Sequence, residues 1–85
     1  MKILIDISLE HYDRILSEFT EESRIYAILK NGLVIHHFEA GNEFRTVEIF
    51  CEKFHARMIL AAAEIYCPEA AAGIREAIRL SHTLH

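Results

Sequence analysis

The feature that most constrains this chain is its longest apolar stripe, which lies between Val47 and Tyr66. Apolar side chains recur there at steps of three and four residues, as on one face of a helix: Val47, Phe50, Cys51, Phe54, Met58, Ala61, Ala62 and Ile65. From Met58 to Ala63 no polar face remains, and a helix that is apolar all round must be covered on more than one side. We therefore expect a long helix at about 43–66, covered by the final helix and by either a sheet or a second copy of the protein.

The chain is short for a stripe of this size. Its 85 residues predict a single domain, 1–85, whose core is marginal, and oligomerisation is a common way for such domains to gain stability. We expect Phe54 and Met58 to be core anchors of the long helix. We also expect a homo-oligomer, with these residues at the interface: Tyr26, Ile28, Ile35, Met58, Ile59 and Leu60.

The rest of the chain divides into short elements. Isoleucines at every second position predict a strand at 2–7, and Ser8 is placed to cap a helix at 9–20. Pro68 ends the long helix and suits the first position of a last helix, at about 69–83.

The segment between Arg24 and Ala40 has two interpretations. Asn31-Gly32 lies between two apolar runs, a strong hairpin signal, which predicts strands at 24–30 and 33–39 with apolar residues on both faces. In the alternative, residues 21–31 form a helix that Gly32 ends in a left-handed cap. We favour the hairpin, so the predicted fold is α+β: a three-stranded sheet (2–7, 24–30, 33–39) packed by helices (9–20, 43–66, 69–83), in the order β-α-β-β-α-α.

Composition excludes several classes of protein. Hydrophobic residues make up 52% of the chain, which argues against disorder, and the formal charge of −4 is unfavourable for binding a phosphate backbone. The longest fully apolar run is too short to span a bilayer, so no membrane association is expected. On one continuous helix Cys51 and Cys67 would lie about 24 Å apart, beyond disulfide reach. Two unpaired thiols favour a cytoplasmic location.

The first third of the chain carries three short motifs: Met1-Lys2-Ile3-Leu4-Ile5-Asp6-Ile7, Tyr12-Asp13-Arg14-Ile15 and Ala27-Ile28-Leu29-Lys30-Asn31-Gly32. With these motifs the segment resembles the start of many small uncharacterised phage and prophage proteins. The Pro-rich sequence that tends to follow their Asn-Gly is replaced here by Leu33-Val34-Ile35-His36-His37. The resemblance does not extend to the C-terminal half. It implies an origin in a mobile element and no particular activity.

Side chains that carry chemistry are few. Cys51 and His55 have the spacing of a zinc-chelating helical pair, but a core cysteine beside a surface histidine explains them better, so we expect no metal. No nucleophile with a positioned base, paired carboxylates or phosphate-binding loop is evident. We therefore expect a protein that is not an enzyme and uses no cofactor.

Three arginines offer the remaining candidate site. Arg75 and Arg79 lie four residues apart on the last predicted helix, and Arg57 lies on the long one. They serve either helix solubility, with Glu64 and Glu76 as partners, or an anion site at an oligomer interface. The favoured function is a non-enzymatic homo-oligomeric protein that binds or blocks another macromolecule, such as a protein. The alternative is a protein that binds or sequesters a small anionic, nucleotide-like ligand through these arginines.

Overall fold

A computed structural model describes residues 2–83 and confirms an α+β fold with a three-stranded sheet. The strands and helices follow one another in this order: β1 (Lys2–Ser8), α1 (Leu9–Leu16), α2 (Arg24–Lys30), β2 (Leu33–Glu39), β3 (Asn42–Glu52), α3 (Lys53–Tyr66) and α4 (Pro68–Thr83).

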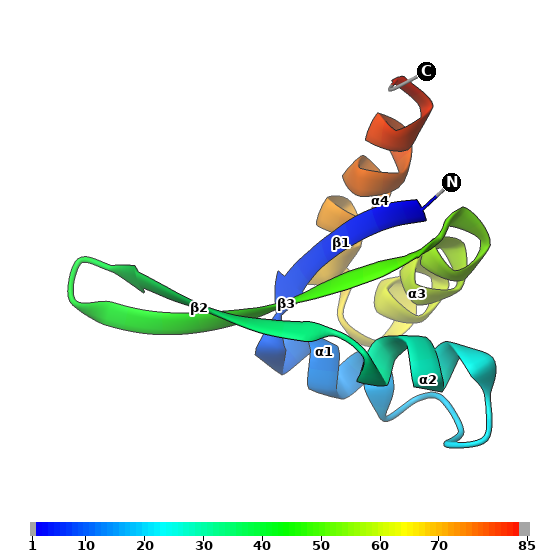
Figure 1. The fold of residues 1–85 in the computed structure, drawn as a ribbon, viewed down its shortest axis with the longest axis horizontal. Helices are drawn as coiled ribbons and strands as arrows, with labels where there is room; N and C mark the ends of the chain where they lie inside the picture. The colour runs from blue at the N-terminus through cyan, green and yellow to red at the C-terminus, as the bar shows by residue number, and fades with distance from the viewer. Residues whose placement is uncertain (1, 84–85) are drawn as a thin grey trace.

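The sheet is antiparallel, with β3 between β1 and β2. β1 pairs with the second part of β3, from Ser8 opposite Thr46 to Lys2 opposite Glu52. β2 pairs with the first part, from Glu39 opposite Asn42 to Leu33 opposite Glu48. The two neighbours overlap along β3 only at residues 46–48. β2 and β3 therefore continue past the end of β1 as a two-stranded projection, residues 36–45, which we call the arm (Figure 1).

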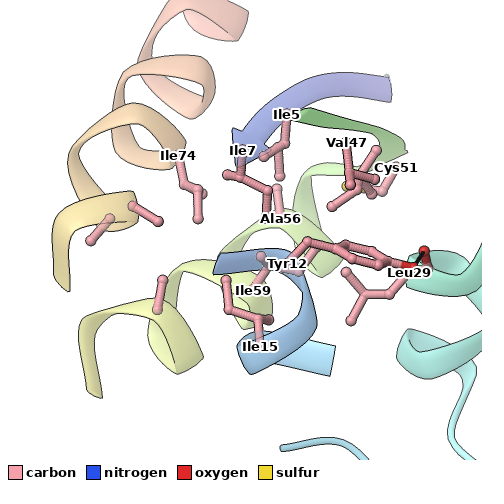
Figure 2. Close-up of a cluster of buried hydrophobic side chains, with 14 of the residues drawn as sticks. Ile5, Ile7, Tyr12, Ile15, Leu29, Val47, Cys51, Ala56, Ile59 and Ile74 are labelled. Carbon is pink, nitrogen blue, oxygen red and sulfur yellow. Dashed lines mark hydrogen bonds between the residues drawn. The ribbon is translucent and has the colours of Figure 1, made fainter. Parts of the chain in front are cut away.

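The core lies on one face of the sheet. Isoleucines of β1 alternate inward against Val47, Ile49 and Cys51 of β3, and helices supply the other side of the core (Figure 2). Ile59 of α3 and Ile74 of α4 are completely buried there.

A buried hydrogen bond joins the first two helices. The Tyr12 hydroxyl of α1 donates to the Leu29 carbonyl of α2 at 2.6 Å (Figure 2). Burial, with a smaller contribution from Asp13, raises the pKa of this phenol. Tyr12 therefore stays neutral and fixes α2 against α1.

The expected strand at 24–30 is wrong, because this segment is helix α2. Ser23 caps it by accepting a hydrogen bond from the Tyr26 amide at 3.2 Å, and Ile25 and Leu29 bury one face. The alternative predicted this helix, but Gly32 does not form the left-handed cap. A Cβ at Gly32 would lie 2.6 Å from Val47 Cγ1, so Gly32 is needed for the close approach of the chain to β3.

The hairpin turn is instead at Ala40-Gly41. Both residues have positive φ, 52° and 83°, as a two-residue type I′ turn requires. The strand predicted at 33–39 is therefore confirmed, but its partner follows it in the chain rather than preceding it.

The long helix expected at 43–66 is wrong in its first ten residues, which belong to β3. Val47, Ile49 and Cys51 are buried at steps of two, so the apolar stripe combines a strand period with the helix period of α3. Phe50 belongs to the apolar stripe only if residues 43–52 are helical, and in β3 it is exposed. Phe54 is in the first turn of α3, but its side chain is 68% exposed. Phe54 is therefore not a core anchor, whereas Met58 packs partly buried against the core.

Candidate interaction surface

The face of the sheet opposite the core has no helix over it among the described residues, and we call it the outer face. Alternation along the strands places these large apolar side chains there: Leu4 of β1, Leu33 and Ile35 of β2, and Phe44 and Phe50 of β3. Leu4 lies directly opposite Phe50, and they are 51% and 63% exposed. Leu33 is 61% exposed. A monomeric soluble domain rarely leaves so many neighbouring apolar side chains in water.

The aromatic rings of the outer face are held by polar neighbours. Lys2 Nζ lies 5.8 Å from the centre of the Phe50 ring. The His37 ring stacks on Phe44 with centroids 5.2 Å apart, and His37 Nε2 lies 2.8 Å from the Thr46 hydroxyl. These contacts orient the rings while leaving much of their surface exposed.

Two carboxylates on the outer face lie directly opposite each other. Asp6 of β1 pairs in register with Glu48 of β3, and like charges at such positions destabilise a sheet. Within residues 2–83 neither carboxylate forms an ion pair with a basic side chain. The apolar surface is therefore combined with uncompensated negative charge.

The β2–β3 hairpin carries exposed side chains on its other face as well. Val34, at the base of the hairpin, and Phe38 point to this side, and Phe38 is 74% exposed. Glu43 Oε1 lies 3.0 Å from His36 Nδ1 and accepts a hydrogen bond from Arg45 Nε at 3.1 Å. The bond with His36, and secondly that with Arg45, lowers the pKa of Glu43.

The predicted interface residues are scattered over the fold. Ile35 is on the outer face, whereas Ile59 is completely buried in the protomer's own core and is not available to a partner. Tyr26 and Ile28 are on α2, and the latter packs against the core. Met58 and Leu60 are partly buried on α3.

The three predicted ligand-binding arginines are exposed on α3 and α4. Arg75 lies 3.7 Å from Glu64, and Arg79 donates to Glu76, which are the partners that the helix-solubility interpretation named. Arg57 lies near the start of α3. An anion site formed by these side chains remains a prediction.

The cysteines are free thiols in buried positions. Burial, above all other causes, raises the pKa of both Cys51 and Cys67, which disfavours the nucleophilic thiolate. Cys51 is in β3 and His55 is in the first turn of α3, so they do not form a helical pair. They border a hollow of about 150 Å³, and His55 Nδ1 is buried there with no hydrogen-bond partner among the residues that the structure describes. Residues 2–83 contain no group of three side chains placed to hold a metal ion.

Leu4, Phe44 and Phe50 were not predicted from the sequence to form an exposed surface. The signal that could have found the last two is the alternation of Phe44, Thr46, Glu48 and Phe50 with Val47, Ile49 and Cys51. Read at a period of two, this segment places the phenylalanines on the face opposite the core.

Comparison with known proteins gives no relative. No protein-family model, curated protein or solved structure matches the chain. Among the helices of residues 2–83, none has the length and apolarity needed to cross a bilayer.

Proposed function

We propose that this protein is a non-enzymatic interaction protein, which acts in the cytoplasm as a homo-oligomer and binds another protein through the outer face of its sheet. The observation that carries the proposal is the uncovered face itself. Leu4, Leu33 and Phe50 are each more than half exposed on neighbouring strands, where most sheets of this size carry polar residues.

The charge of the outer face indicates the chemistry of the partner. Asp6 and Glu48 lie directly opposite each other, and within residues 2–83 neither pairs with a basic side chain, so a Lys or Arg from a partner would relieve their repulsion. Next to them, Leu4 and Phe50 offer an apolar surface with aromatic character, which is typical of binding hot spots. We therefore expect the partner surface to combine basic and apolar side chains.

Site-specific photocrosslinking in the host cell tests this proposal. A photoreactive phenylalanine analogue at Phe50 should give discrete adducts with one partner, because that side chain is 63% exposed on the outer face, beside Leu4. The same analogue at Ile65, which is 70% exposed on α3, is the matched control. Equal adducts from both positions would show that the outer face has no special role.

A second variant tests the electrostatic part. Asp6→Asn with Glu48→Gln keeps the shape of both side chains and removes their charges. We expect weaker capture at Phe50 and a smaller dependence on salt, because charge pairs at an interface are screened. Unchanged capture would restrict recognition to the apolar residues.

A further inference from the structure

We infer that two copies of this chain associate by antiparallel pairing of their β2 strands, with His36 on the two-fold axis. This inference rests on the homo-oligomer in the proposed function and specifies its interface. It begins from the side of β2 that faces away from β3, which we call the β2 edge.

The β2 edge is open along its length. β3 is the only described element against which β2 packs extensively, and none of the seven β2 residues is buried. Figure 1 shows the arm projecting away from the helices. An open strand edge is a template for another strand, and proteins that avoid pairing place Lys, Pro or a bulge there. β2 has none of these: its residues are Leu33-Val34-Ile35-His36-His37-Phe38-Glu39, and its pairing with β3 is continuous.

The turn determines which backbone groups the edge presents. In a two-residue hairpin the flanking pair, here Glu39 and Asn42, is hydrogen-bonded. Backbone groups then alternate along the strand, so those of Leu33, Ile35 and His37 also point to β3. The N–H and C=O groups of Val34, His36 and Phe38 point outward, which leaves a regular ladder free for a second strand.

Full overlap of two such strands fixes their register. Because β2 covers residues 33–39, an antiparallel pair that uses all seven positions places residue 36 opposite itself. This register also makes His36 a hydrogen-bonded pair, consistent with its outward backbone groups. Moving the axis by one residue, to Ile35 or His37, would put backbone groups that point to β3 on the axis and would shorten the ladder.

In this register the side chains of two copies complement one another. Val34 of one copy lies opposite Phe38 of the other, twice by symmetry, and these side chains are 42% and 74% exposed in the single chain. On the outer face Ile35 lies opposite His37. The only carboxylate of β2, Glu39, lies opposite Leu33, so no like-charged carboxylates meet although the chain is acidic.

The same pairing joins the two outer faces. Two sheets in the order β1-β3-β2, paired through β2, give one continuous sheet with both copies of Leu33 and Ile35 near its middle. The partner-binding surface of the proposed function would then span the dimer.

Cysteine crosslinking tests the register directly. A H36C variant should form a disulfide-linked dimer under mild oxidation, because Cα atoms of an antiparallel hydrogen-bonded pair are about 5.5 Å apart. An E39C variant is the matched control, since in this register the two copies of residue 39 are roughly 20 Å apart. The native thiols are buried, so wild-type protein is the blank. Equal crosslinking of both variants would overturn the inference.

Substitutions at the β2 edge, followed by light scattering, test the proposed interface separately from the existence of a homo-oligomer. Val34→Lys with Phe38→Lys should convert a dimer to a monomer, whereas Ile65→Lys, at an exposed position of α3, should leave it dimeric. If the β2 variant also remains a dimer and melts like the wild type, the interface lies elsewhere and only the inference fails. A stable small dimer should be populated at a protein concentration on the order of 100 µM. If the wild type is still a monomer at that concentration, the inference and the homo-oligomer both fail. The crosslinking at Phe50 would still decide whether the outer face binds a partner.

Amide hydrogen exchange provides a readout that requires no substitution. On concentration into the dimer, the outward amides of Val34, His36 and Phe38 should gain about tenfold or more in protection, while those of Ile35 and His37 change little. Uniform protection of all five, or of none, would contradict edge pairing.

Discussion

β1 and β2 are the two outer strands of one sheet, and each pairs with β3 over seven residues. β1 alternates strictly: Ile3, Ile5 and Ile7 are buried, while Lys2, Leu4 and Asp6 point outward, and α4 packs along the strand. β2 is as rich in large apolar residues, yet none of its residues is buried. The fold of one chain therefore accounts for the sequence of β1 but not for that of β2. The proposed pairing of two β2 strands would account for this difference.

Truncation of matched isoleucines should separate the two strands most strongly. Ile5→Ala in β1 should cost roughly 2–5 kcal/mol, because Ile5 is buried and its removal leaves a cavity. Ile35→Ala in β2 should cost less than about 1 kcal/mol in dilute protein, since Ile35 lies on the uncovered face. Denaturant unfolding measures both. Equal losses would mean that β2 is as important as β1 to the fold of the single chain.

The sequence predicted β1 and β2 well for different reasons. The period of two in β1 and the capping Ser8 define its bounds, while β2 was identified as apolar on both faces. The prediction was wrong about the strand that pairs with β2, which is β3 and not residues 24–30. Asn31-Gly32 has the composition of a hairpin turn, but Ser23 caps a helix before it, and the close packing of Gly32 on Val47 is a tertiary contact that no local pattern shows. The true turn, Ala40-Gly41, uses an alanine with positive φ, which composition does not favour.

The candidate surface was predictable only in part. Ile35 follows from the predicted strand at 33–39, but Phe44 and Phe50 depend on knowing that residues 43–52 are strand. In that segment the apolar residues fit steps of two and of three or four equally well, so periodicity alone could not decide. The β-branched residues Thr46, Val47 and Ile49 favoured the strand.

Gly32, the residue before β2, offers the next test of the difference between β1 and β2. Gly32→Ala should destabilise the protein by about 1–3 kcal/mol, because the added Cβ would meet Val47 Cγ1 at 2.6 Å and the Leu29 carbonyl oxygen at 3.0 Å. Gly73→Ala in α4 is the control, since nothing lies within 4 Å of the new Cβ, and it should stabilise by about 0.5–1 kcal/mol. Thermal unfolding of both variants checks the signs. A neutral Gly32→Ala would mean that β2 is not anchored to the core at its start.

A smaller effect is expected at the tip of the arm. Gly41→Ala places a Cβ at φ 83° and should cost about 1 kcal/mol, although nothing lies close to it in space. Because the arm is remote from the core, we expect the loss in the amide protection of β2 and of the first residues of β3 rather than in that of β1. Equal loss of protection in β1 would show that the arm and the core unfold as one unit.

The smallest effect concerns the charge cluster of the arm, which β1 lacks. The pKa of Glu43 is lowered first by its hydrogen bond with His36 and then by that with Arg45. A carboxyl whose pKa is lower in the folded than in the unfolded chain contributes stability above its unfolded pKa and loses it as the pH falls through the folded value. The arm should therefore lose stability as the pH falls below the ordinary pKa of a glutamate, through the lowered pKa of Glu43. NMR titration of the Glu43 side chain should show its pKa rising toward the ordinary value in His36→Ala, and by less in Arg45→Ala. If His36→Ala leaves this pKa unchanged, the contact does not persist in solution. The arm would then be held by its backbone pairing alone.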